Sequence, residues 1–163
     1  MIRTLAHHNS VAGRVHVEVA LASGVRTPGA AVGVVADDRR WATTTHGATV
    51  RPSDISMPQL MSRYMIDNVE FLKVDIEGAE FGLLAANVDL GWLTRVNQIA
   101  IELHPLHGDT RALIQRLMQH GFHVELSDND GNPLEADAAD IAYAYCHRAR
   151  ATTSTAWAGT AGT

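Results

Sequence analysis

The chain has 163 residues, of which 46% are hydrophobic and 19% are charged, so we expect one globular domain with its own core. The net charge is −5 and no block of basic residues occurs, which argues against binding to nucleic acid or to an anionic membrane surface. No apolar run reaches the ~18–20 residues of a membrane span and the N-terminus lacks the hydrophobic segment of a signal peptide, so we expect a cytoplasmic protein.

The first third of the chain carries the weakest pattern. Residues 1–23, "MIRTLAHHNSVAGRVHVEVALAS", are typical of a helix end, a turn and a strand. In that strand Val15, Val17 and Val19 alternate with polar residues, which predicts one wetter face. From residue 24 to about residue 49 only short β-rich pieces are expected.

The segment "ISMPQLMSRYMIDN", residues 55–68, predicts a helix. Ser56 with Gln59 three residues later forms a capping-box pattern at its start. One face of this helix is apolar and is expected in the core. It comprises Leu60, Met61, Tyr64 and Met65.

Strands and helices alternate from residue 69 onward. "VEFLKVDI" predicts a strand, "GAEFGLLAA" a short helix and "VNQIAIELH" the next strand. A longer helix is expected to begin at Asp109 or Thr110 and to end at Gly121. Its predicted apolar stripe comprises Leu113, Ile114, Leu117 and Met118. "FHVELSD" and "DIAYAYCHR" predict two last strands, joined by a loop containing "NDGNP".

This order of elements predicts an α/β domain of Rossmann-like type with right-handed crossovers. We expect a mostly parallel sheet whose last two strands pair antiparallel at its edge, because only a loop joins them. The domain is predicted to span residues 1–148. Residues 149–163 are small and polar without a period, and we expect a disordered tail there.

Cysteine and histidine usage gives little sign of a metal. The single cysteine, Cys146, excludes an internal disulfide and a cysteine-based zinc cage, and its apolar neighbours predict a buried, unreactive thiol. Only "ELHPLH" brings an acid and two imidazoles together, and no H-x-x-E-H or similar helical motif occurs. We therefore predict no metal site. The other histidines form no ligand spacing on a recognisable element: His7, His8, His16, His46, His120, His123 and His147.

Polar residues lie inside two of the predicted strands. With a period of two, Lys73 and Asp75 share one face of the first strand, and Glu102 and His104 share one face of the next. If the strands are parallel neighbours, Lys73 would meet Glu102, and Asp75 would meet His104. The first pair could simply fix the strand register as a buried ion pair. The second lies at the carboxyl ends of the strands, where α/β sheets hold their ligands.

The turn after the first of these strands adds two further candidates. Glu77 projects from the loop itself, and Gly78 permits a tight turn and the close approach of a ligand to the backbone. Glu80 falls in the first turn of the following helix, where the helix dipole favours an anion, so structure alone explains it.

The segment "FLKVDIEGAEFGLL", preceded by "ISMPQLMSRY" and followed by "IAIELHP", resembles the FkbM family of S-adenosylmethionine-dependent methyltransferases. The family hallmark alternates hydrophobic positions with K, D, E-G and E. Here it is met by Lys73, Asp75, Glu77, Gly78 and Glu80, and the following strand ends in Glu102 and His104. The resemblance covers residues 5 to 147 and is most specific over residues 69–104.

The resemblance implies transfer of the S-adenosylmethionine methyl group to a hydroxyl oxygen of a small molecule or sugar. Asp75 or His104 would be the general base, with the partner orienting it. Glu77 and Glu102 would shape the acceptor site or hold a cation. Asp75 and Gly78 would contact the cofactor.

The chain departs from methyltransferases of this class at its start. No glycine-rich turn follows a first strand, and no acidic residue ends a second strand to hold the ribose hydroxyls. We therefore expect an N-terminally incomplete domain, similar to the last two-thirds of a methyltransferase. An alternative is an inactive remnant or interaction module that associates with itself or another chain through exposed sheet edges.

A second alternative uses the same cluster as a divalent-metal hydrolase. Carboxylate and imidazole groups are competent metal ligands. The candidate ligands are Asp75, Glu77, Glu102, His104 and His107.

Overall fold

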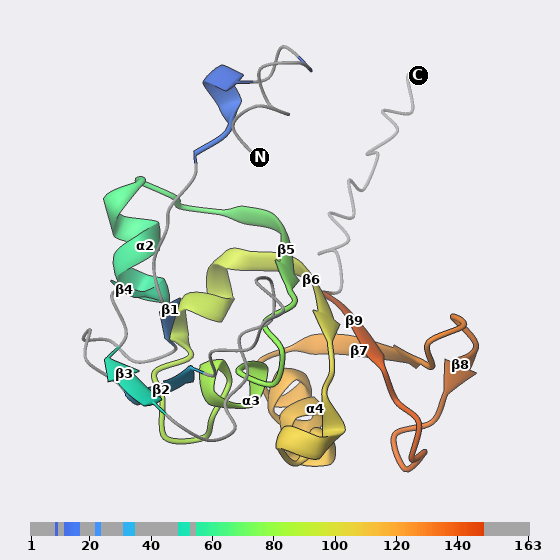
Figure 1. Cartoon of the computed structure of the whole chain (residues 1–163). Coiled ribbons are helices and arrows are strands. Elements are labelled where there is room, and N and C mark those ends of the chain that lie inside the picture. The colour runs from blue at the N-terminus through green and yellow to red at the C-terminus, as the bar shows by residue number, and fades with distance from the viewer. Residues whose placement is uncertain are drawn as a thin grey trace, which may run out of the picture.

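The computed structural model describes Asn9 and residues 12–16, 22–23, 31–34, 49–52 and 55–148 (Figure 1). The strand expected near residues 15–20 lies mostly outside the described residues, and the expected tail, residues 149–163, lies wholly outside them. The first described elements are the 3-10 turn η1 (Ala12–Arg14), β1 (Ala22–Ser23), β2 (Ala31–Val34), β3 (Thr49–Pro52) and β4 (Ile55–Ser56). β1 pairs parallel with β4, and β2 pairs antiparallel with β3.

The elements after residue 56 form the body of the molecule. They are α2 (Met57–Arg63), β5 (Val69–Val74), α3 (Glu80–Leu83), η2 (Gly91–Arg95), β6 (Val96–Glu102), η3 (Pro105–His107), α4 (Thr110–Gln119), β7 (Phe122–Ser127), β8 (Pro133–Leu134) and β9 (Tyr143–Arg148). Five of the strands build one sheet in the order β5-β6-β9-β7-β8. Figure 1 shows α4 beside this sheet, and α4 packs against β7.

The sheet is mixed, so the expectation of a mostly parallel sheet is not confirmed. β5 and β6 pair parallel, but β9 runs antiparallel to both β6 and β7, and β8 runs antiparallel to β7. The predicted antiparallel pairing of the last two long strands is present. It lies inside the sheet and not at its edge, because β9 inserts between β6 and β7.

Local signals start both longer helices as predicted. At α2, the Ser56 hydroxyl accepts a hydrogen bond from the Gln59 N–H at 3.3 Å, and the Ser56 N–H donates to Gln59 Oε1 at 3.1 Å. This is the reciprocal capping box. At α4, the Asp109 carboxylate accepts from the Ala112 N–H at 2.9 Å. Each cap satisfies N–H groups that have no partner within the first turn of a helix.

The last residue of each predicted apolar stripe proves to be exposed. Met61 in α2, and Leu113, Ile114 and Leu117 in α4, are buried as expected. Met65 is 86% exposed because α2 ends at Arg63 and the chain then turns, with Met65 at φ 52°. Met118 is 57% exposed and lies on the solvent side of α4.

Buried apolar side chains from β6, β9, η2 and α4 form the core. Its most enclosed members include Leu93, Val96, Ile101, Leu113, Leu117 and Ala144. Cys146 lies in this core, and burial raises the pKa of its thiol to about 12. The thiol is therefore protonated and inert at neutral pH, as the sequence predicts.

The opposite face of the sheet is exposed to solvent. Phe71 on β5 is 57% exposed and Tyr145 on β9 is 48% exposed. In β6, Ile99 and Ile101 are buried, while Gln98, Ala100 and Glu102 are more exposed. The predicted period of two is thus confirmed, and it leaves one row of each long strand free to carry polar groups.

Candidate functional site

The strand register decides which polar residues meet at the end of β5 and β6. Lys73 pairs with Ala100 across the two strands, so the next outward position, Asp75, comes level with Glu102. The predicted pairing of Lys73 with Glu102 is therefore wrong, because the residue level with Glu102 is Asp75, two residues further along the chain. The expected buried ion pair is also wrong, because the Lys73 side chain is 65% exposed.

Lys73 instead forms an ion pair with Asp75, its neighbour on the same strand face. Lys73 Nζ lies 2.6 Å from Asp75 Oδ2. This hydrogen bond is the largest cause that lowers the pKa of Asp75, and it raises the pKa of Lys73. Burial works in the opposite direction on Asp75, but Glu102 and the charge of His104 lower its pKa further. Asp75 is thus a fixed negative charge at the strand end, close to both Glu102 and His104.

Glu80 contacts both the backbone and the imidazole of His104. Its side chain is completely buried, at 0% exposure. Glu80 Oε1 accepts the His104 backbone N–H at 2.9 Å and lies 3.1 Å from His104 Nδ1. Glu80 Oε2 accepts the Gly78 N–H at 2.8 Å. A buried carboxylate is tolerated only when such partners replace its water, so these contacts fix the ring of His104.

The second nitrogen of His104 faces the rim of the site. His104 Nε2 lies 3.3 Å from Glu77 Oε2, and both side chains are partly exposed, at 20% and 29%. Glu77 adopts a positive φ of 52°, which lets its side chain turn back toward His104. The imidazole is therefore held between one buried and one accessible carboxylate.

Two glycines bring the loop after β5 against the loop after β6. Gly78 has φ 95°, and a Cβ there would lie 2.5 Å from Cγ of His107. A Cβ on Gly108 would lie 2.3 Å from Cγ of Phe81. Any residue larger than glycine at either position would overlap its neighbour. The two glycines therefore let the loops pack closely enough for Glu77 and Glu80 to reach His104.

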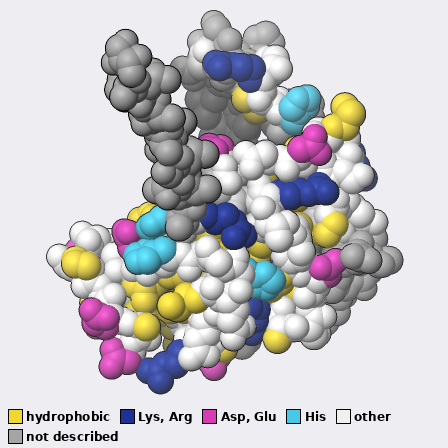
Figure 2. Space-filling model, turned by 180° about the vertical axis from the view of Figure 1, so that it is seen from behind, with side chains coloured by type: hydrophobic (Ala, Val, Ile, Leu, Met, Phe, Trp, Pro, Cys, Tyr) yellow, Lys and Arg dark blue, Asp and Glu magenta, His cyan; other side chains and the backbone are white. Residues whose placement is uncertain are grey.

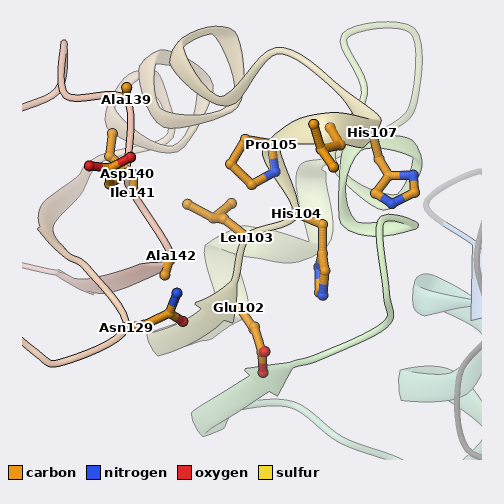
Figure 3. Close-up of a pocket in the computed structure, with 11 residues that line it drawn as sticks. Glu102, Leu103, His104, Pro105, His107, Asn129, Ala139, Asp140, Ile141 and Ala142 are labelled. Carbon is orange, nitrogen blue, oxygen red and sulfur yellow. The ribbon is translucent and has the colours of Figure 1, made fainter.

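A pocket of about 490 Å³ opens beside this cluster at the end of β6 (Figure 3). Glu102 and His104 line one side, and Asn129 with residues 139–142 line the other, with Leu103 and Pro105 between them. Pockets of this size bind small molecules, and a few polar groups in an apolar wall set their specificity.

The structure thus brings together Asp75, Glu77, Glu102 and His104 around one rim, with Gly78 buried beneath it. Only Glu102 and His104 of these line the pocket itself. Sequence reasoning missed that the Glu80 carboxylate clamps the two loops together by accepting the N–H groups of Gly78 and His104, although Glu80 completes the hallmark motif. It also missed the far wall around Asn129 and residues 139–142, because no pattern in the sequence marks a loop that folds back over a distant strand end.

Comparisons with known proteins identify one family. Residues 3–124 match the family described as the methyltransferase FkbM domain. No curated protein and no solved structure matches the chain. Among the described residues, no helix has both the length and the apolar character needed to cross a membrane.

Proposed function

Because the chain belongs to the FkbM methyltransferase domain family, we propose that it transfers the methyl group of S-adenosylmethionine to a hydroxyl oxygen of a small molecule or sugar. Membership of the family supports a methyltransferase with a methyl donor. The observation that supports this particular site is the imidazole of His104, held between Glu80 and Glu77 at the rim of the pocket.

The residues at the rim fit a cationic methyl donor. Asp75 is held ionised by Lys73, and Glu77 and Glu102 add carboxylates nearby. When bound, S-adenosylmethionine supplies an electrophilic methyl group on a positively charged sulfur. Asp75 would hold the cofactor by charge. The Gly78 N–H already donates to Glu80, so Gly78 would contribute through its missing side chain rather than through a hydrogen bond.

His104 is the better candidate for the general base. Its Nδ1 faces the buried Glu80, so the nitrogen that would exchange a proton at the rim is Nε2, which lies 3.3 Å from the accessible Glu77 carboxylate. As the acceptor oxygen forms its bond to the methyl carbon and the sulfur–carbon bond breaks, the hydroxyl proton would pass to Nε2. Asp75 is less suited to this role, because the lowered pKa weakens it as a base.

Glu77 and Glu102 would orient the acceptor. Both carboxylates lie near His104, and carboxylates accept hydrogen bonds from hydroxyl groups. Positioning a hydroxyl in line with the sulfur–methyl bond contributes much of the rate enhancement available to such a reaction.

Calorimetry with S-adenosylmethionine, which carries the positively charged sulfur, tests the proposal. The wild-type chain should bind it, and Asp75→Asn should weaken binding about tenfold, as expected for loss of one charged contact worth ~1.4 kcal/mol. Asp67→Asn removes an exposed carboxylate before β5 and is the matched control, with unchanged affinity. Absence of heat with the wild-type chain, or an equal loss in both variants, would contradict the proposal.

A further inference from the structure

Three side chains outside the rim come together on the exposed face of the sheet. They are His123 and Glu125 on β7 and His147 on β9. His123 Nδ1 lies 3.9 Å, and His147 Nδ1 4.0 Å, from Glu125 Oε1. The three ligand atoms all lie within 4.8 Å of one another, although the sequence alone suggests that these histidines are scattered.

The strand pairing fixes this arrangement. His123 and His147 are direct partners across the antiparallel β7–β9 pair, and their ring centroids are 4.8 Å apart. Glu125 lies two residues beyond His123 on the same strand, so it points to the same face. The next partners along, Val124 and Cys146, turn inward, and Cys146 is buried. Because Val124 and Cys146 point into the core, His123, Glu125 and His147 all point to the outer face.

The surroundings leave these groups accessible. The side chains of His123, Glu125 and His147 are 65%, 64% and 48% exposed. Figure 2 views the molecule from behind and shows histidine side chains gathered beside an acidic side chain at the border of a hydrophobic area. An ion from solution could therefore reach the cluster without any movement of the backbone.

From this geometry we propose that His123, Glu125 and His147 bind a zinc ion. Two imidazoles and one carboxylate are ligands that zinc prefers, and a fourth position stays open to water. Metal–ligand bonds of about 2.0–2.2 Å place ligand atoms of a tetrahedral site ~3.4 Å apart. The observed separations of 3.9 and 4.0 Å are slightly longer, and exposed side chains close such a gap by small rotations.

The rim of the pocket does not offer the same convergence. There the two nitrogens of His104 face different carboxylates, one on Glu80 and one on Glu77. The zinc cluster also lies toward the opposite end of the sheet. β7 runs in the same direction as β6, and His123 is near its start, whereas Glu102 ends β6. The zinc site is therefore independent of the proposed methyl transfer.

A bound ion would link the two strands of the β7–β9 pair. A ligand that binds only the folded chain stabilises it by an amount that grows with the logarithm of the free ligand concentration once this exceeds the Kd. Zinc should accordingly raise the melting temperature of the chain, and it should do so only when both histidines are present.

Zinc titration of the full chain, prepared without a histidine tag and freed of metal by a chelator, tests this proposal. Calorimetry should show one ion bound per chain, and cobalt should give the visible absorption of a tetrahedral site. His123→Gln and His147→Gln should each weaken zinc binding about tenfold or more. Glu125→Gln should also weaken it. His16→Gln, which removes an exposed histidine elsewhere, should leave it unchanged.

Three results would overturn the assignment. They are no zinc binding by the wild-type chain, full binding by the double variant His123→Gln/His147→Gln, and loss of binding in His104→Gln with the double variant intact. Because the variants change exposed side chains, their melting temperatures without zinc should match the wild type, which separates a lost ligand from a lost fold.

Discussion

The carboxylate of Glu80 is completely buried. This residue determines where His104 lies. Its two oxygens accept backbone N–H groups from both loops, one from Gly78 and one from His104. An unpaired carboxylate in this position would cost several kcal/mol. The position therefore requires an acceptor at both oxygens, and the same contacts orient the imidazole above it.

Replacing Glu80 by glutamine should destabilise the fold. The amide keeps the shape but offers one oxygen acceptor in place of two, so one backbone N–H loses its partner inside the protein. We expect the free energy of unfolding, measured with urea, to fall by about 2 kcal/mol for Glu80→Gln. The exposed Glu135→Gln should change it by less than ~0.5 kcal/mol. Equal effects in the two variants would contradict the clamping role.

At the scale of elements, the site depends on two glycines, each of which lies against a side chain from the other segment. Gly78, after β5, contacts His107, and Gly108, after η3, contacts Phe81. These side chains approach the backbone of each glycine closely because neither glycine has a Cβ. The parallel β5–β6 pair brings both loops to the same end of the sheet, and the glycines set the remaining distance between them.

Gly78→Ala tests this contact against a matched glycine. Gly78 and Gly131 both have positive φ, at 95° and 84°, but a Cβ on Gly131 would meet nothing within 4 Å. Gly131→Ala should cost only the left-handed strain, about 1 kcal/mol. Gly78→Ala should cost at least ~1 kcal/mol more in the free energy of unfolding, because its Cβ overlaps His107.

A second change identifies the source of that excess. Adding His107→Ala to Gly78→Ala removes the two ring carbons at 2.5 and 2.8 Å but keeps the Cβ at 2.9 Å, so the double variant should recover part of the difference between the two glycine positions. If Gly78→Ala and Gly131→Ala prove equally costly, the packing of the two loops does not depend on the glycine contact.

Elements governed by local sequence were predictable, and those governed by distant contacts were not. The helix caps and the period of two depend on neighbours within a few residues, and both are confirmed. The register of β5 on β6 depends on the whole sheet, so Lys73 was assigned the wrong partner. The end of α2 was also misjudged, because the turn at Met65 carries no glycine to mark it.

At the scale of the whole molecule, topology explains which parts of the sites could be foreseen. The rim at the ends of β5 and β6 was predicted, because parallel neighbouring strands must end together. The antiparallel pairing of β7 with β9 was predicted, but the facing of His123 and His147 was missed, because it depends on the register of that pair. The loop sequence between the two strands does not specify this register.

The central claim is that the imidazole of His104, at the end of β6, lies at the rim where the acceptor hydroxyl meets the methyl donor. Nuclear magnetic resonance of the full chain with ¹⁵N-labelled histidine rings tests it directly, as S-adenosylmethionine is added. We expect the ring signals of His104 to shift, those of its neighbour His107 to shift less, and those of His123 and His147 to stay in place. Unchanged His104 signals at saturating cofactor, or shifts confined to the β7–β9 face, would contradict the account.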